Sequence, residues 1–385
     1  MMKLHDIQLS AKPATAKRNF LAKSLMIATA SLTLSAVALP AAAATWWDAT
    51  PHIAIGSRTI NVKNTGAKGN GSHDDTAAIQ RAINALPRSG GTVYVPAGRY
   101  MINALKPLRL RSHTRLKLDP NAELRVIPNG ASRYVVVKVF NVNNVAIVGG
   151  KITGDRARHK GSRGEWGYGI NISGSDHVLV RNVRISEFWG DGMWIGATGK
   201  GRRLDRSNYV TVNNVTSSHN RRQGLSIGPS QHVYIVNSTF QNTRGTLPEA
   251  GIDFEPQDQG PVNTVRVENN TFANNRGNGV EVHTNVSGVT FTRNRFTSNR
   301  GFGLMSISAH HLTLTGNHAT RNGLAGLRMS ARTHHASIRG NTLQYNSTRY
   351  MSPARAGGAT SRDIQIGNKT YAISRSNNTL SPRRK

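Results

Sequence analysis

Two acidic residues, two positions apart, are the first candidates for chemistry in this chain. The stretch AGIDFEPQDQG, residues 250–260, predicts a short strand followed by a turn. On a strand, Ile252 and Phe254 point to one face, and Asp253 and Glu255 point to the other. Their Cα atoms would lie roughly 6.6 Å apart. This spacing suits the paired carboxyl groups of inverting glycosidases, which lie ~6.5–9.5 Å apart with a water between them.

The element that carries these acids belongs to a repeat. Short apolar strands follow glycines at a period of 23 to 32 residues, and the intervening sequence is rich in Asn and Gly. The glycines are Gly169, Gly192, Gly224, Gly251, Gly279, Gly303 and Gly326. This pattern predicts a parallel β-helix, whose stacked coils bury a continuous apolar column. A leucine-rich repeat would need a fixed Leu spacing, and a β-propeller would need longer repeats. Asn suits the corners because it tolerates left-handed backbone.

Stacking would bring residues of successive coils together on one outer face. The second position of each strand points outward and holds Asn171, Trp194, Ser226, Asp253, Glu281, Met305 and Arg328. Because coils lie ~4.8 Å apart, Asp253 is expected beside Glu281, and Glu255 beside His283. The predicted catalytic residues are Asp253, Glu255, Glu281 and His283. The predicted substrate-binding residues are Asp191, Trp194, Arg202, Arg222, Gln223 and Arg328.

The net charge indicates which partners the protein attracts. The formal charge is +31, and it is +27 without residues 1–44, which hold five basic residues and one acidic residue. Such a charge attracts polyanions. Two long insertions beside the outer face, residues 154–169 and 197–208, are themselves basic. We therefore expect an acidic polysaccharide as partner. Nucleic acid is not expected as a partner, because the N-terminal residues predict export and the chain has few aromatic residues and no nucleic-acid-binding motif.

The N-terminal residues predict export and set the domain boundaries. Residues 1–44 contain a basic region, an apolar run from Leu25 to Leu39 and small residues up to Ala44. We expect a signal peptide cleaved near Ala44, and a periplasmic or secreted protein without a membrane span. The β-helix domain is expected over residues 45–350, with residues 351–385 as a basic tail, ordered in part at most. No cysteine is present, so the core must hold the fold; we expect a monomer.

One segment resembles a known family. Residues 60–102 read INVKNTGAKGNGSHDDTAAIQRAINALPRSGGTVYVPAGRYMI, with a helix expected from Thr76 to Leu86 behind an N-cap at Asp74 or Asp75. This segment resembles the entry segment of the pectate-lyase-like superfamily, which includes polygalacturonases, rhamnogalacturonases, phage tailspikes and mannuronan C5-epimerases. The resemblance implies an all-β, right-handed, single-stranded parallel β-helix with an N-terminal capping helix. It also implies a glycan ligand.

The chain departs from the site patterns of these relatives. It has GDG at residues 190–192 in place of the double Asp of polygalacturonases, and it has no Gly-His-Gly. The Asp-Pro-His-Asp stretch of the mannuronan epimerases is also absent. The resemblance therefore implies a fold and a class of ligand but leaves the reaction open.

Hydrolysis by paired carboxylates is the first functional hypothesis. Asp253 and Glu255 would share the acid and base roles, Glu281 would raise the pKa of the acid, and His283 would orient it. No metal or cofactor is needed for this reaction. Since like charges facing each other destabilise a sheet, Asp253 opposite Glu281 requires a shared proton, a metal ion or neutralisation by Arg222.

Two alternatives stay open. A lyase or C5-epimerase would abstract the C5 proton of a uronate, with Arg222, Arg328 or His283 at its carboxylate. Ca²⁺ held by Asp253, Glu255 and Glu281 would favour a lyase. The other alternative is a non-catalytic protein that binds exopolysaccharide through charge alone.

Overall fold

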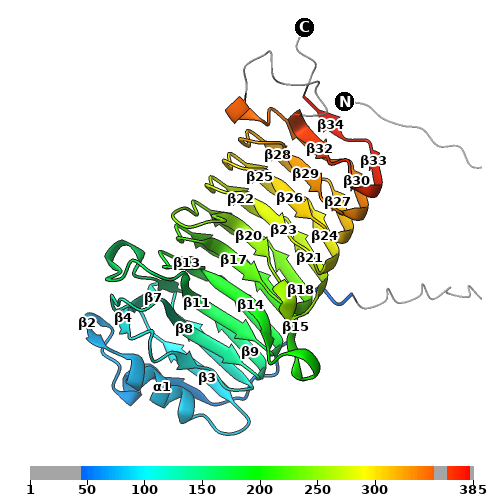
Figure 1. Ribbon diagram of the computed structural model, residues 1–385. Coiled ribbons are helices and arrows are strands. Elements are labelled where there is room, and N and C mark those ends of the chain that lie inside the picture. Colours follow the sequence, from blue (N-terminus) through cyan, green and yellow to red (C-terminus); the bar gives the residue numbers. More distant parts are fainter. Residues whose placement is uncertain (1–44, 351–361, 382–385) are drawn as a thin grey trace, which may run out of the picture. The chain divides into compact units, whose positions relative to one another are not determined.

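Stacked coils of three strands form the protein, and strands of successive coils pair in parallel (Figure 1). The computed structural model describes residues 45–350 and 362–381. The predicted signal peptide, residues 1–44, lies outside the described residues. The all-β parallel β-helix predicted from the period is confirmed, and its strands form three columns.

The first column contains β1 (Thr59–Asn61), β3 (Gly91–Val95), β6 (Thr114–Leu118), β9 (Asn143–Val148), β12 (Asp176–Arg181), β15 (Asp205–Asn213), β18 (Ser230–Val236), β21 (Val262–Glu268), β24 (Val286–Thr292), β27 (His310–Thr315), β30 (His334–Arg339) and β33 (Tyr371–Ser376). The second contains β2 (Asn70–Asp74), β4 (Gly98–Ile102), β7 (Ala122–Val126), β10 (Lys151–Thr153), β13 (Arg184–Ser186), β16 (Thr216–Ser218), β19 (Thr239–Gln241), β22 (Thr271–Ala273), β25 (Arg295–Thr297), β28 (His318–Thr320), β31 (Thr342–Gln344) and β34 (Thr379–Leu380). The third, which carries the predicted site, contains β5 (Leu108–Arg109), β8 (Arg133–Phe140), β11 (Trp166–Ser173), β14 (Met193–Thr198), β17 (Gln223–Ile227), β20 (Ala250–Phe254), β23 (Val280–Val282), β26 (Leu304–Ile307), β29 (Leu327–Ser330) and β32 (Ile364–Ile366).

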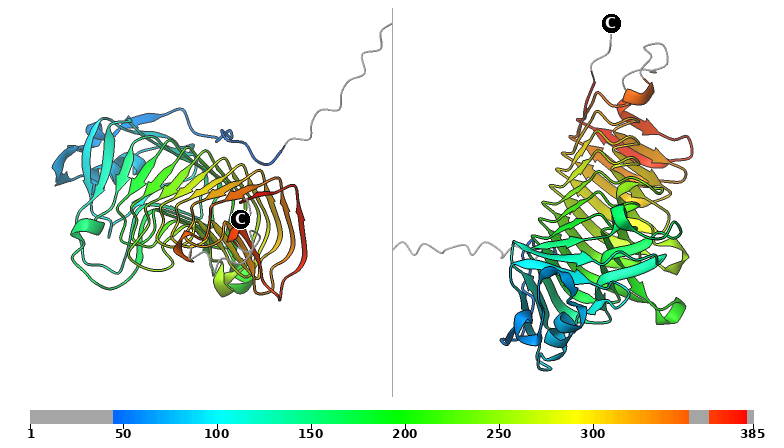
Figure 2. Two further views of the ribbon diagram at one scale, coloured as in Figure 1. Left: turned by 90° about the horizontal axis from the view of Figure 1, so that it is seen from above. Right: turned by 90° about the vertical axis from the view of Figure 1, so that its left-hand side faces the viewer.

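Helix α1 (Thr76–Asn84) lies at the N-terminal end of the stack (Figure 2). Asp74 Oδ1 accepts a hydrogen bond from Thr76 N at 3.0 Å, while Asp75 accepts from Lys68 N and Gly69 N in the preceding turn. The apolar face of α1 joins the core of the coils through Ala78, Ile79, Ala82 and Ile83. In the described part of the chain, no helix is long and apolar enough to cross a membrane.

Five short 3₁₀ helices lie in the described connections. They are η1 (Val62–Thr65), η2 (Arg156–Arg158), η3 (Gly201–Arg203), η4 (Gln257–Gln259) and η5 (Thr348–Tyr350). η2 and η3 occur inside the two basic insertions, and η4 follows the strand that carries Asp253.

The core is a column of inward side chains, one set from each coil. In the second column, the rings of Phe240, Phe272 and Phe296 stack with centroids 5.6 and 5.1 Å apart. Such aromatic contacts add to the free energy gained by burying apolar surface. In the third column, Ile252 and Phe254 point inward and are fully buried. This alternation forces Asp253 to the outer face.

Buried asparagines connect the coils at two corners. One ladder contains Asn270, Asn294, Asn317 and Asn341, and the other contains Asn275, Asn299, Asn322 and Asn346. Asn294 Nδ2 donates to Val267 O at 2.8 Å and to Asn317 Oδ1 at 3.0 Å, and Asn294 Oδ1 accepts from Asn270 N at 3.0 Å. The left-handed backbone predicted for corner asparagines is found at the residue directly before each ladder asparagine, for example at Asn269 before Asn270. The corners therefore use Asn both for its backbone tolerance and for its amide.

The N-terminal residues 45–58 run along the outside of the stack (Figure 2), and we call this segment the strap. Trp46 packs edge-on against His232, with ring centroids 5.3 Å apart, and the Arg266 guanidinium lies 4.8 Å from the Trp47 ring centroid. The strap is thus fastened to the outer face of the first column, a feature that the sequence patterns did not predict.

The stack continues past residue 350, into the segment expected to be a tail. β32, β33 and β34 pair in parallel with β29, β30 and β31 and complete another coil. Ile364 and Ile373 continue the apolar column, which explains why this segment folds onto the stack.

Candidate active site

The outward residues of the third column follow the predicted register. Ser226, Asp253 and Glu281 are direct partners on β17, β20 and β23, and the ladder continues through Met305 to Arg328. The acids do not lie on an open face, however. Asp253 is 2% exposed and Glu281 is 7% exposed, because neighbouring side chains cover them. Burial changes the acid chemistry of Asp253.

Asp253 is the most enclosed acid of the predicted catalytic set. Gln223 Nε2 donates to Asp253 Oδ2 at 2.6 Å, and His283 Nε2 lies 3.1 Å from Asp253 Oδ1. Burial raises the pKa of Asp253 to about 6, with further upward contributions from the charges of Glu255 and Glu281; the hydrogen bond from His283 acts in the opposite direction. Asp253 therefore exchanges its proton near neutral pH.

His283 stands between two carboxylates. Its Nε2 lies 3.1 Å from Asp253 Oδ1 and 3.2 Å from Glu281 Oε2. Hydrogen bonds with Asp253 and then with Glu281 raise the pKa of His283 to about 10, against the effect of partial burial. The imidazole is therefore a cation at neutral pH. It provides the neutralisation that Asp253 opposite Glu281 requires.

Arg222 forms the second charge cluster. Its Nη1 and Nη2 donate to Glu255 Oε1 and Oε2, each at 2.8 Å, in a bidentate pair. Nη1 also lies 3.2 Å from Asp191 Oδ2, and Nε lies 3.8 Å from Glu165 Oε2. The nearby carboxylates raise the pKa of Arg222 above its usual range despite the opposing effect of burial. The planar guanidinium matches the carboxylate fork and fixes the orientation of Glu255.

Asp191 is completely buried beside this cluster. Ser226 Oγ donates to Asp191 Oδ2 at 2.8 Å, and Asp191 Oδ1 has no hydrogen-bond partner among the described residues. Burial raises the pKa of Asp191 to about 7, although the positive charge of Arg222 lowers it. The predicted substrate-binding residues Asp191 and Gln223 are therefore fully buried and support the acids from below, whereas Arg222 stays about a tenth exposed at the site.

A pocket of about 490 Å³ opens over these groups. Its charged lining consists of Arg222, Asp253, Glu255, Asp258, Glu281 and His283. Leu247 and Pro248 form an apolar wall, and Leu247 is 77% exposed. The four acids outnumber the two cations, and both cations are paired with carboxylates. The pocket itself therefore offers little free positive charge to an acidic ligand.

Of the six predicted substrate-binding residues, Arg222 lines this pocket; Asp191 and Gln223 are buried beside it, and the other three lie elsewhere. Trp194 packs beside Tyr168 and over Gly196 and Gly228, where an added Cβ would meet indole atoms at 2.5 and 2.7 Å. Arg202 lies in η3, at the tip of the hairpin that joins β14 to β15. Arg328 lies two coils beyond Glu281, where its Nη1 donates to Gln365 Oε1. Neither basic insertion contributes a residue to the pocket lining. The insertion of residues 154–169 approaches the cluster through Glu165, whose Oε2 lies 3.8 Å from Arg222 Nε.

Other site residues were missed by the sequence reasoning. Asn278 Nδ2 donates to Glu281 Oε1 at 2.7 Å. Tyr168 is buried near Asp191, and burial raises the pKa of its phenol well above the usual range. Tyr168, Asp191, Gln223 and Asn278 all directly precede the glycine of their coil. This shared position was the available signal, but only two of its members were used.

Metal ligation must be weighed for Asp253, Glu281 and His283, whose ligand atoms lie within 4.8 Å of one another. Glu255, which the sequence suggested as a calcium ligand with Asp253 and Glu281, is bound at both oxygens by Arg222, and an imidazole nitrogen is a poor calcium ligand. In this structure His283 Nε2 lies between Asp253 Oδ1 and Glu281 Oε2, so the three side chains form an ion triad.

Comparisons with known proteins place the chain in a family. Residues 59–305 match the family described as "Rhamnogalacturonase A/epimerase, pectate lyase-like", and the chain belongs to it. Residues 249–381 match the "Right handed beta helix region", in agreement with the predicted handedness.

Individual relatives match only in part. The SPbeta prophage-derived uncharacterized protein YorA of Bacillus subtilis is 32% identical over 203 residues, 46% of this chain and 34% of YorA. An iota-carrageenase of Alteromonas macleodii is 30% identical over 106 residues, 26% of this chain and 21% of that enzyme. The chain thus spans about a third of the length of YorA.

A solved structure with the same fold is the A-module of the Azotobacter vinelandii mannuronan C-5 epimerase AlgE6. It aligns with a TM-score of 0.62 at 18% identity, over 84% of this chain and 100% of the module. At this identity the likeness concerns the fold alone.

Proposed function

We propose that this chain is a carbohydrate-active enzyme that hydrolyses glycosidic bonds of an acidic polysaccharide. One observation carries the proposal: Asp253, with a pKa raised to about 6, lies on the floor of a pocket beside two further carboxylates. A group with a pKa near the working pH is suited to general acid catalysis. Membership of a family named for rhamnogalacturonase and epimerase, and the similarity to an iota-carrageenase, support a polysaccharide substrate.

Asp253 and Glu255 have distinct roles in this proposal. Asp253 gives its proton to the glycosidic oxygen as the bond between that oxygen and the anomeric carbon breaks. Glu255 takes a proton from the water that attacks the anomeric carbon. The bidentate bond from Arg222 uses one lone pair on each oxygen of Glu255, so each oxygen keeps another that can accept this proton. Glu281 and His283 then set the pKa of Asp253.

The test is the formation of new reducing ends from a panel of carboxylated and sulfated polysaccharides. The parent protein is expected to release them, and Asp253→Asn is expected to lose at least a hundredfold in rate, the scale of general acid catalysis. Asp176→Asn, at an exposed position of β12, is the matched control and should retain full activity. Equal rates for the parent and Asp253→Asn would refute the assignment.

A second reaction is supported by His283. A cationic imidazole beside a buried carboxyl can neutralise the carboxylate of a bound uronate, which makes its C5 proton easier to remove. Elimination would give a conjugated double bond and ultraviolet absorbance, and epimerisation would change the ratio of uronate epimers without new ends. If no panel member gives any of these products but binding is salt-sensitive, the chain is a non-catalytic glycan-binding protein.

A further inference from the structure

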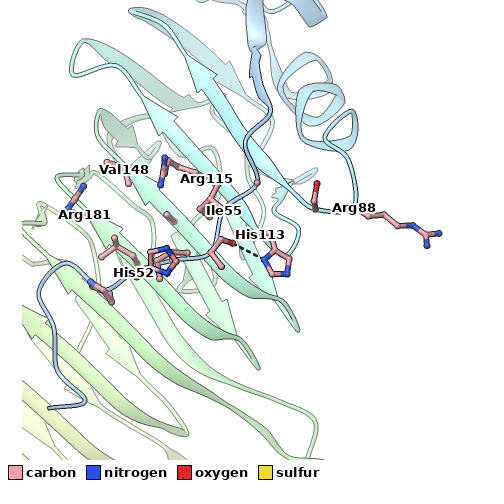
Figure 3. A pocket seen from close by; sticks show the side chains of 14 residues that line it. His52, Ile55, Arg88, His113, Arg115, Val148 and Arg181 are labelled. Carbon is pink, nitrogen blue, oxygen red and sulfur yellow. Dashed lines mark hydrogen bonds between the residues drawn. The ribbon is translucent and has the colours of Figure 1, made fainter. Parts of the chain in front are cut away.

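A cleft of about 850 Å³ lies between the strap and the outer face of the first column, away from the Asp253 pocket (Figure 3). Its strap side consists of residues 51–56, and its sheet side comes from β6, β9 and β12. We call it the strap cleft. Because the Asp253 pocket lies on the third column, the two cavities belong to different faces of the stack.

Specific contacts hold the strap over this face. Ala54 N donates to Asn144 Oδ1 at 3.3 Å, and Ala54 O lies 2.9 Å from His113 Nδ1. Ile53 packs with Ala146 and Leu179 in a small apolar cluster of its own. The cleft is therefore a built feature with an apolar floor.

The charges around the cleft have one sign. The charged and titratable lining residues are His52, Arg88, His113, Arg115 and Arg181, and none of the 14 lining residues is acidic. In Figure 3, Arg115 and Arg181 lie on the same side of the strap with Val148 between them, whereas Arg88 extends away from the group. Arg115 and Arg181 therefore converge on the cleft.

Arg181 carries an unsatisfied polar group. Its Nε is buried and has no hydrogen-bond partner within residues 45–350 and 362–381. A buried donor without an acceptor destabilises the fold. The Nε atom itself is covered, so an anion in the cleft would meet the outer nitrogens of this guanidinium and form charge-assisted hydrogen bonds there.

The spacing of the two arginines suits a chain rather than a single ion. Arg115 lies on β6 and Arg181 on β12, so they are separated by two coils, about 10 Å along the stack. One small anion cannot contact both guanidinium groups at this distance. A sugar chain with acidic groups on successive repeats can, while the apolar face of one of its rings rests on the partly buried Val148.

We propose that the strap cleft is a second binding site for an acidic oligosaccharide, held by Arg115 and Arg181. The ligand class rests on the proposed function, but the site does not depend on catalysis. The Asp253 pocket has no unpaired cation, so the strap cleft supplies the positive charge that retains an acidic polymer near the enzyme.

Calorimetric titration of an oligouronate of six sugars tests the site. The background is Asp253→Asn, which keeps the glycan intact. Arg115→Gln with Arg181→Gln is expected to weaken binding at least tenfold and to reduce its dependence on salt. The matched control is Arg295→Gln with Arg339→Gln, two exposed arginines that remove the same charge, Arg339 lying on the outer face of the same column. The control is expected to bind as the background does.

The proposal is overturned if the double variant binds like the background, or if the control loses as much affinity. Two further arms address the source of the anion. Inorganic phosphate is expected to compete weakly, because it can contact only one arginine, and tight binding of phosphate would contradict a chain ligand. The proposal would also be overturned if binding to vesicles of anionic lipid were lost in the double variant while its binding of the oligouronate stayed unchanged.

Catalysis is measured separately on the parent protein. If no polysaccharide is cleaved but the double variant loses oligouronate binding, the strap cleft stands and the proposed hydrolysis falls. If cleavage occurs and the double variant binds normally, the hydrolysis stands and the strap cleft falls.

Discussion

Arg222 holds Glu255 through two hydrogen bonds of 2.8 Å, and this pair links the start of β17 to the residue after β20. Both side chains are about nine-tenths buried. The pair therefore connects neighbouring coils at the point where the proposed base must be held still. Its geometry, rather than its charge alone, is the feature that substitution can test.

Removal of Arg222 is expected to destabilise the fold. Arg222→Met leaves Glu255 buried without its partner, so the free energy of unfolding should fall by about 3–5 kcal/mol. Arg222→Lys keeps the charge but loses the bidentate hydrogen bonds, so its free energy of unfolding should lie between those of the parent and Arg222→Met. Denaturant unfolding measures both. The control is Arg99→Met, which breaks the exposed pair with Glu123 and should cost less than about 1 kcal/mol. Equal losses for Arg222→Met and Arg99→Met would contradict this interpretation.

Asp191 and Asp253 predict an unusual dependence of stability on pH. Their pKa values are raised from 3.8 to about 7 and about 6, mainly by burial. Between pH 4 and 7 the folded chain therefore binds more protons than the unfolded chain, and these groups make stability fall as pH rises. Asp191→Asn should flatten that slope in unfolding measured across this window. An unchanged slope would mean that Asp191 is ionised throughout.

His283 predicts a shift in the pH profile of catalysis. Since its hydrogen bond lowers the pKa of Asp253, His283→Gln should raise that pKa. The alkaline limb of kcat/KM should then move to higher pH. The control is His310→Gln, which lies on the first column away from the pocket. If the alkaline limb of His283→Gln stays at the pH of the parent, His283 does not influence the pKa of Asp253.

The same substitution also changes stability. The pKa of His283 in the folded chain is raised from 6.5 to about 10, so its stabilising effect is complete below pH 6.5 and lost as pH rises through about 10. The parent should therefore lose stability over this range, and His283→Gln should lose less. Thermal unfolding at pH 6, 8 and 10 measures the difference.

The asparagine ladders should be far more sensitive than surface asparagines. Asn294→Ala removes two donated hydrogen bonds and leaves Val267 O and Asn270 N without their partner. The expected loss is about 2–4 kcal/mol in the free energy of unfolding. Asn121→Ala, at an exposed position of a turn, should change stability by less than about 0.5 kcal/mol. Comparable losses at both positions would show that the ladder adds nothing beyond local backbone preference.

The sequence was sufficient to predict the coils and the outward ladder, because both follow from local alternation and a regular period. Asp253 beside Glu281 is a direct result of that period. The burial of these acids was not predictable in the same way. It depends on Arg222 and Gln223, whose side chains reach the next coil, and on Asn278, which contacts Glu281 within its own coil; alternation specifies none of these directions.

The insertions were the weaker part of the prediction. Their basic composition indicated an anion-binding wall, but the path of a loop of this length is set by its own contacts. Trp189 Nε1 donates to Arg163 O, and Arg221 donates to Gly164 O, so residues 163–164 are drawn toward the second-column side of the coil. The strap was missed because it has no repeat pattern at all.

The described strands of each coil pair in parallel only with strands of the coils before and after it. The chemistry at Asp253 therefore needs its immediate neighbours in place, but it does not depend on how many turns follow β29. Whole turns beyond β29 can therefore be added or removed as a spacer without changing the neighbours of Asp253.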